Sequence, residues 1–243
     1  MSELFMRLEH LFLKLDHTAL IVEQMIADAL FTVENGRDED VENLIEFDVN
    51  VDMREVETER ECIRLLALYQ PTAIDLRRIS FVVKANSDLE RIGDYSVKIA
   101  KRGRKTKQEC IAIKSFPAFF KLAEQVTATY RKTIRLFTLH GNNESVDIEC
   151  GMELARSIIT IDVETNVLFR EFLDQTLAVE EMFYGRLAVW HDLTALGRAL
   201  RQIGDLCMHI AEDAIFMFSG EIVRHDLLNT SVASSESHQV GTK

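Results

Sequence analysis

Residues 89–94, with the sequence LERIGD, recur 111 residues later at 200–205 as LRQIGD. A second pair lies upstream, where residues 45–52, IEFDVNVD, are echoed 114 residues later by residues 159–166, ITIDVETN. Two matches in the same order and at nearly equal offsets indicate an internal duplication. We therefore expect the chain to contain two copies of one structural unit.

The chain around these repeats favours long helices. Only two prolines and ten glycines occur in 243 residues, so few positions break a helix. Apolar residues return at helical spacing, Asp38 is a suitable N-cap, and Pro71 stands where proline can open a helix. The expected helices are 2–34, 38–69, 71–101, 117–140, 144–175 and 180–223, the last with a break near Gly185. The predicted fold is all-α, with two tandem three-helix bundles.

The expected units divide the chain into three parts. We assign residues 1–106 to the first bundle, 107–228 to the second, and the small, polar stretch 229–243 to a disordered tail. A basic, glycine-containing segment, 98–107, lies near the boundary of the bundles. It is either an anion-binding surface or a set of cations that complement a helix C-terminus without any ligand.

Composition excludes several classes of protein. The residues are 47% apolar and 28% charged, which is typical of a globular chain, and the net charge of −12 opposes binding to a nucleic-acid backbone. The N-terminus has no signal-peptide pattern and no stretch of 18 uncharged apolar residues occurs, so we expect a cytoplasmic protein without a membrane span. The four cysteines lack CxxC spacing, which predicts reduced thiols instead of a disulfide framework or a thiolate zinc site.

Acidic residues fall on the apolar faces of two expected helices. On a helical wheel, the apolar residues of the second helix that lie within about 60° of one line should face the bundle; they are Val41, Leu44, Ile45, Val56, Ile63 and Leu66. Four acids share that face: Asp48, Asp52, Glu55 and Glu59. On the third helix, the stripe of Ile79, Val82, Val83 and Val97 also holds Glu90 and Asp94.

Six acids on packed faces need a balancing charge, because burying an isolated carboxylate costs several kcal/mol. The neighbouring arginines, Arg54, Arg60, Arg64 and Arg91, project to other sectors of the wheel. A metal ion is one solution, and ligation by oxygen alone favours hard ions such as Mg²⁺, Mn²⁺, Ca²⁺ or Fe³⁺. The alternative is a thin bundle whose acids face a solvated groove and bind nothing.

Three motifs together resemble the PhoU family of bacterial phosphate-signalling regulators: Asp48-xxx-Asp52, residues 65–77 (LLALYQPTAIDLR) and residues 88–94 (DLERIGD). The resemblance covers nearly the whole chain, and it implies two tandem three-helix bundles with metal clusters held by (Glu/Asp)-xxx-Asp motifs. It implies that Asp48, Asp52, Glu90 and Asp94 bind a metal ion, and their oxygen ligands favour Fe, Mn or Mg. Glu55 and Glu59 are added from the helical wheel.

The same resemblance implies a function and partners. A member of the family is expected to be a non-enzymatic adaptor between the ATPase subunit of the phosphate-specific ABC transporter and a sensor histidine kinase. It would restrain phosphate-starvation genes and phosphate uptake when phosphate is plentiful. We also expect a homodimer and no direct contact with nucleic acid.

The second half departs from the motif. It has Asn166 where the first half has Asp52, and Arg201 where the first half has Glu90, so only Asp162 and Asp205 remain as a weak remnant of the site. We expect Arg201 to pair with Asp205 one helical turn away. His209 is an alternative ligand for a metal ion there.

Two other functions stay open at this point. Clustered carboxylates with two metal ions are also typical of hydrolases that act on phosphate esters. A purely structural bundle with solvated acids is the third reading. Nucleotide-binding and ferritin-like classes find no support, because the sequence lacks GxxxxGK[ST], GxGxxG and any Glu-xx-His pair.

Overall fold

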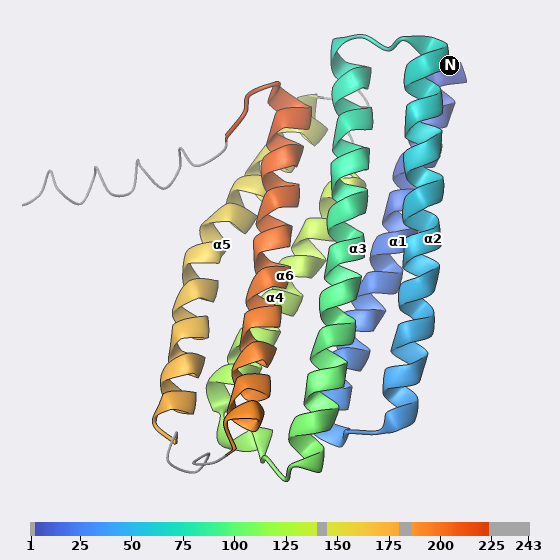
Figure 1. The fold of residues 1–243 in the computed structure, drawn as a ribbon. Coiled ribbons are helices and arrows are strands. Elements are labelled where there is room, and N and C mark those ends of the chain that lie inside the picture. The colour runs from blue at the N-terminus through green and yellow to red at the C-terminus, as the bar shows by residue number, and fades with distance from the viewer. Residues whose placement is uncertain (1–2, 140–144, 180–185, 224–243) are drawn as a thin grey trace, which may run out of the picture.

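The computed structural model describes residues 3–139, 145–179 and 186–223, and within these the chain is helical without a strand (Figure 1). The predicted all-α class is confirmed. The elements, in chain order, are α1 (Glu3–Asn35), α2 (Asp38–Tyr69), α3 (Ala73–Gln108), the 3₁₀ turn η1 (Ile113–Ser115), α4 (Pro117–Ile134), the 3₁₀ turn η2 (Arg135–Phe137), α5 (Ser145–Leu177) and α6 (Leu187–Ser219).

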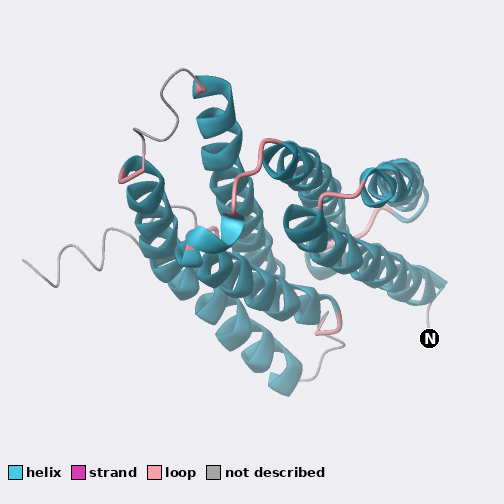
Figure 2. Cartoon of the chain, turned by 90° about the horizontal axis from the view of Figure 1, so that it is seen from below, coloured by secondary structure: helices cyan, strands magenta, loops and turns pink. Residues whose placement is uncertain are grey.

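The six helices form the two expected bundles. Helices α1, α2 and α3 pack together, as do α4, α5 and α6, and α3 packs along α6 to join the two groups. In the view from below, the helices of each half lie as adjoining groups (Figure 2). One buried apolar cluster includes residues of both bundles. Helices α3 and α6 therefore lie in the middle, and α2 and α5 lie at opposite sides (Figure 1).

The buried side of α2 follows a repeat of seven residues. The positions that face the bundle are alternately three and four residues apart. Asp48 and Glu55 are half-buried members of this series. Its fully buried members are Val41, Leu44, Val51, Thr58, Cys62 and Leu65. The expectation that Ile45, Val56 and Ile63 face the bundle is wrong, since they are 38%, 41% and 57% exposed. The buried positions form a seam that repeats every 3.5 residues, whereas the helical wheel assumes 3.6 residues per turn. The two differ by about 20° per heptad, so the wheel assigned a face of α2 that lies beside the true interface.

The same seam recurs in α5 at an offset of 114 residues. Asp162 and Phe169 are half-buried, where α2 has Asp48 and Glu55. The fully buried positions between and around them are Ala155, Ile158, Thr165, Phe172 and Thr176. The repeat read from the sequence is thus also a repeat of burial.

Helix ends differ from the expectations at three places. Gln70, with φ of 44°, caps α2 in the left-handed region, and Thr72 is the N-cap of α3, so Pro71 precedes the helix instead of opening it. Asp38 is the first residue of α2, and Arg37 is its N-cap. Helix α3 continues to Gln108 and not to residue 101, and within this extension Gly103 packs closely on Val33 of α1.

The basic segment forms the last turns of α3 and binds other parts of the chain. Arg102 and Lys105 contact Asp192 of α6 at 2.9 and 3.2 Å. Arg104 pairs with Asp38 at 3.0 Å, and the Lys107 ammonium donates to the Glu34 carbonyl. These contacts favour the interpretation without a ligand.

Several sequence expectations fall at the edges of the described residues. The helix expected over 117–140 ends at Ile134 and passes into η2. The proposed break near Gly185 and the tail 229–243 lie outside the described residues. The division between residues 106 and 107 falls in the last turn of α3 and stays a prediction. Among the described helices, none is long and apolar enough to cross a membrane.

We predict that Gly103→Ala destabilises the protein. A Cβ at this position would lie 2.6 Å from Val33 Cγ2 and 2.7 Å from Val33 Cα, and a backbone atom cannot give way without moving α1. The expected loss in the free energy of unfolding is about 1–3 kcal/mol, measured by urea denaturation.

The matched control is Gly93→Ala on the same helix. Its Cβ would meet ordinary contacts at 3.4 and 3.5 Å. Stability should stay unchanged or rise by up to about 1 kcal/mol, because alanine favours helix. Equal stability of Gly103→Ala and the unchanged protein would contradict the close α1–α3 packing.

Candidate functional site

Four predicted site residues come together between α2 and α3. Asp48 and Asp52 lie one turn apart on α2, and Glu90 and Asp94 one turn apart on α3; we call this set the carboxylate quartet. Burial and the negative charges of Asp52 and Asp94 together raise the pKa of Asp48 from 3.8 to about 6. Burial also raises the pKa of Glu90, with contributions from the other three. The tertiary structure therefore places the four carboxyl groups in one electrostatic neighbourhood.

Two residues of α3 hold α2 in place beside the quartet. Gly93 presents no side chain, and a Cβ built there would lie 3.5 Å from Asp48 Oδ1, so this carboxylate rests against the α3 backbone. The buried Asn86 side chain donates a hydrogen bond of 2.9 Å to the carbonyl of Glu55. Sequence reasoning missed Asn86, because a lone polar residue on a helix gives no sign of its partner.

The two further acids of α2, Glu55 and Glu59, differ in burial. Glu55 is half-buried, and its pKa is raised by burial and by the charges of Glu59 and Asp52. Glu59 and Asp52 are exposed. The expectation that all four α2 acids lie in the middle of the packed face is thus wrong, since only Asp48 and Glu55 occupy the buried seam.

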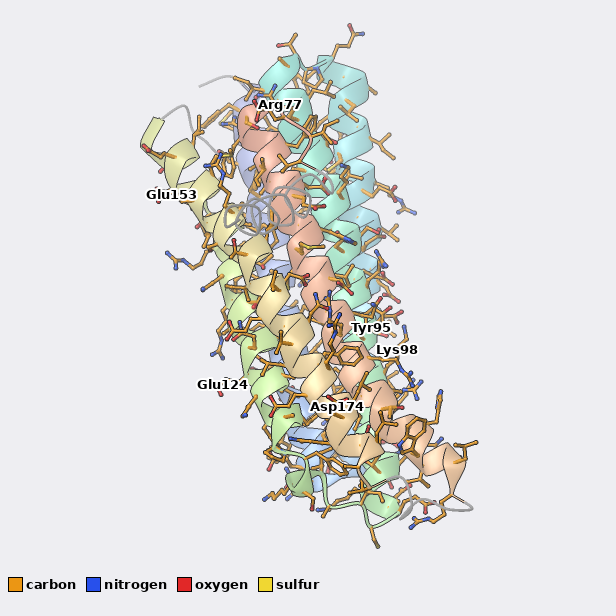
Figure 3. The ribbon with its side chains drawn as sticks, turned by 90° about the vertical axis from the view of Figure 1, so that its left-hand side faces the viewer. Arg77, Tyr95, Lys98, Glu124, Glu153 and Asp174 are labelled. Carbon is orange, nitrogen blue, oxygen red and sulfur yellow. The ribbon has the colours of Figure 1, made fainter. Side chains whose placement is uncertain are left out.

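Lysines of α3 supply the positive charge at one edge of the quartet. The Lys98 ammonium lies 2.9 Å from Asp94 Oδ2, and it also lies 4.6 Å from the centroid of the Tyr95 ring (Figure 3). The charges of Lys101 and Lys98 lower the pKa of Asp48 against the larger effects of burial and neighbouring acids. The Lys98–Asp94 pair is half exposed, and such pairs stabilise by at most about 1 kcal/mol. The four-residue spacing of Asp94 and Lys98 in the sequence already indicates this pair.

The donor set of the quartet fits a hard metal ion by its chemistry. Every donor is a carboxylate oxygen, and Mg²⁺, Mn²⁺ and iron accept such ligands. Within the described part of the chain, no three histidine, cysteine or carboxylate side chains converge closely enough to hold an ion as they stand. Ligation therefore requires the half-exposed side chains to turn toward one another.

The equivalent place in the second half holds a guanidinium group. The side chain of Arg201 extends from α6 to α5 and is only 14% exposed. Its Nη1 lies 3.1 Å from Asp162 Oδ1. Its Nε donates to Asn166 Oδ1 at 2.6 Å, and the same arginine pairs with Asp205. We call these four residues the arginine site. The predicted pairing of Arg201 with Asp205 is confirmed.

The members of the arginine site also contact one another, while Asp162 Oδ1 and Arg201 Nη1 are held by ion pairs without a hydrogen bond. The Asn166 amide also donates to Asp162 Oδ2 at 3.0 Å, so the two α5 residues contact each other as well as the arginine. Burial raises the pKa of Asp205, and the charge of Arg201 lowers it. His209, the alternative ligand, lines a hollow of about 430 Å³ between α3 and α6 together with Asp88.

The cysteines agree with the expectation of free thiols. All four are unpaired with one another, Cys62 and Cys207 being buried and Cys110 and Cys150 exposed. Burial raises the pKa of both buried thiols to about 12. Neither is a thiolate near neutral pH, so neither is a nucleophile there.

Comparison with known proteins identifies relatives of both sequence and fold. Residues 15–103 match the family model described as PhoU domain, and this stretch includes the carboxylate quartet. A relative from Escherichia coli (strain K12), the phosphate-specific transport system accessory protein PhoU, is 30% identical over 89% of this chain and 87% of its own length. A PhoU homolog from Aquifex aeolicus is 31% identical over 92% of this chain and 96% of its own length.

Solved structures repeat the fold. The crystal structure of PhoU from Pseudomonas aeruginosa aligns with a TM-score of 0.80 at 24% identity, covering 90% of this chain and all of that one. The phosphate transport system regulatory protein PhoU from Streptococcus pneumoniae aligns with a TM-score of 0.78 at 21% identity, covering 91% and 99%. At these identities the structures support the arrangement of the helices.

We predict that Asp48→Asn stabilises the metal-free protein near pH 7. The folded pKa of Asp48, about 6, exceeds its ordinary value of 3.8, so the folded state holds this proton more tightly. Stability therefore falls as pH rises through this window, and the loss is complete above it. Because water screens the half-buried carboxyl, we expect a gain of about 1 kcal/mol for the variant at neutral pH, shrinking to nothing near pH 4.

Urea denaturation in the presence of a chelator, repeated between these two pH values, measures the difference. Asp174→Asn, at an exposed position of α5, is the control and should show no such pH-dependent gain. A constant difference between Asp48→Asn and the unchanged protein at every pH would show that Asp48 does not titrate in this window.

Proposed function

The chain belongs to the PhoU family, and on this basis we propose that it is an accessory protein of phosphate-specific transport that regulates phosphate homeostasis without catalysing a reaction. The named relatives are accessory or regulatory proteins of this kind. Similarity extends over both bundles and not only over the stretch matched by the family model. The proposed role therefore concerns the whole chain.

We further propose that the carboxylate quartet binds a metal ion. The observation that carries this proposal is the position of Arg201, which places a positive charge among Asp162, Asn166 and Asp205. The equivalent position in the first half is Glu90, so the first half has an oxygen donor in place of the tethered cation. A bound Fe, Mn or Mg ion would supply the charge there and offset the repulsion among the four carboxylates.

The second half is proposed to bind metal weakly or not at all. Asp162 and Asp205, the remaining acids, are already paired with Arg201. A metal ion would have to displace a guanidinium group that is mostly buried and held by three partners.

The proposed partners are other proteins. A net charge of −12 opposes direct binding to DNA, so control of transcription has to pass through a protein intermediate. The ATPase subunit of the phosphate ABC transporter and the phosphate sensor histidine kinase are the partners that the family resemblance suggests, in the cytoplasm. A homodimer is also proposed, and sedimentation of the purified protein checks it.

We predict that Glu90→Arg removes most of the bound metal. The change copies the second half, placing a guanidinium group where the ion needs a carboxylate oxygen. Metal per chain, measured by elemental analysis after purification and dialysis, should fall by about tenfold or more. Circular dichroism should report the helical content of the unchanged protein.

The reciprocal variant, Asn166→Asp with Arg201→Glu, restores in the second half the residue types of the quartet. It should bind additional metal, which tests the assignment in the opposite direction. Equal metal content in Glu90→Arg, in the reciprocal variant and in the unchanged protein would refute the metal proposal while leaving the regulatory role intact.

The regulatory role has a separate test. Deleting the gene in its host should leave phosphate-responsive genes active in phosphate-rich medium, and restoring the intact protein should silence them. Suppose deletion changes neither this expression nor phosphate uptake, while the purified protein hydrolyses phosphate esters at enzymatic rates. The metal-dependent hydrolase would then replace the regulator.

A further inference from the structure

The outward faces of α2 and α5 carry exposed apolar side chains at equivalent positions. Three on each helix are related by the same offset of 114 residues that relates the buried seams. They are Val49, Met53 and Ile63 on α2, 53%, 58% and 57% exposed, and Val163, Val167 and Leu177 on α5, 59%, 59% and 51% exposed. We call these two sets the outer stripes.

Helical geometry places each set on one side of its helix. Residues 49 and 53 are one turn apart, and residue 63 follows residue 49 by two heptads, which returns it to the same side. Val56, 41% exposed, lies one heptad after Val49 and extends the α2 stripe. The α2 stripe therefore runs along several turns of its helix. On α5 the charged residues Arg170 and Asp174 stand between Val167 and Leu177.

Isolated apolar residues on a surface are ordinary, but these recur after the two halves have diverged. Neighbouring positions in the same helices have changed character: Arg54 corresponds to Leu168, Glu55 to Phe169 and Glu59 to Leu173. α2 packs on α1 and α3, and α5 packs on α4 and α6, with the two outer helices at opposite sides of the molecule (Figure 1). The stripes are thus not explained by the packing of the bundles.

Acidic side chains flank both stripes. On α2 the exposed acids beside the stripe are Glu46, Asp52, Glu57 and Glu59, against two exposed bases, Arg60 and Arg64. On α5 the exposed acids are Glu164 and Asp174, with the half-buried Glu171 beside them, against Arg170. Asp174 lies on the side of α5 that faces the viewer in Figure 3. Lys121 of α4 pairs with Glu171 at 3.3 Å, so the α5 stripe is the less acidic of the two.

From this pattern we propose that the outer stripes are two equivalent docking faces for a basic amphipathic helix of a partner protein, so that one chain binds two such helices. An apolar ridge flanked by Lys and Arg matches an apolar stripe flanked by carboxylates. A second copy of this chain is the poorer occupant, because face-to-face docking would enclose Asp52 and Glu59 of both copies. The negatively charged surface of a lipid bilayer is also a poor occupant, because the acids beside the stripes repel it.

Peptide binding is measured in the presence of a chelator, so that its result does not depend on a metal ion at the carboxylate quartet. The probe is a synthetic helical peptide about 20 residues long, with leucines on one side and lysines and arginines flanking them. A peptide of the same composition in scrambled order controls for simple charge attraction. Titration calorimetry near physiological salt reports affinity and the number of peptides per chain.

We expect two peptides to bind per chain, the tighter one at α2. Val49→Ser with Met53→Ser should weaken the α2 site by about tenfold, and Val163→Ser with Val167→Ser should do the same to the α5 site. These residues are more than half exposed, so the helices should remain folded. Leu13→Ser with Leu20→Ser is the matched control, because these α1 side chains are 66% and 49% exposed but lie outside both stripes, and it should leave binding unchanged.

Other results would overturn the proposal. Absence of peptide binding, equal binding of the scrambled peptide, or binding that survives both double substitutions would exclude the stripes as docking faces. A dimer of the unchanged protein that either double substitution splits would assign the stripe to a second copy of the chain. Loss of metal in Glu90→Arg with unchanged peptide binding would leave this inference standing, which separates it from the proposed metal site.

Discussion

A carboxylate on the packed seam of a helix needs a positive charge beside it, and both halves of this chain are built around that requirement. Asp48 and Asp162 occupy equivalent half-buried positions on α2 and α5, where water solvates an ion less well than at the surface. The second half meets the requirement with Arg201, which reaches Asp162 at 3.1 Å from the neighbouring helix. The first half places more carboxylates there, and burial and mutual repulsion raise the pKa of Asp48 to about 6.

The helices that carry these groups are also the ones that join the bundles. Helix α3 presents Glu90 and Asp94 toward α2 and packs its other side along α6, which in turn carries Arg201 and Asp205. The α3–α6 contact is fastened near both ends by ion pairs, Lys84 with Asp213 at 2.7 Å and Arg102 with Asp192 at 2.9 Å. The two charge sites are therefore held in one frame, whereas α2 and α5 each cover only one of them and leave an outer side to solvent.

The inner helices hold the charge sites and the outer helices expose apolar side chains, an arrangement that fits a protein that binds other proteins. In one half the acids are paired with Arg201, whereas in the other the carboxylates lie beside one another and raise the pKa of Asp48 and Glu90. The outer helices display apolar side chains that the bundles do not need for their own packing. The proposed regulator of transport would use such surfaces to contact a partner protein.

The sequence by itself determined the helical class, the duplication, the paired acids one turn apart and the exchange of Glu90 for Arg201, because each of these is a local or periodic feature of the chain. Only the tertiary structure decided which acids of α2 point inward. A straight wheel placed Asp48, Asp52, Glu55 and Glu59 together, but the real seam follows a repeat of 3.5 residues and selects Asp48 and Glu55. The supporting Asn86 and the α3–α6 junction also came from the fold. Burial and pairing depend on which neighbouring helix covers a side chain, and that is fixed by how the helices pack and not by the periodicity of any one of them.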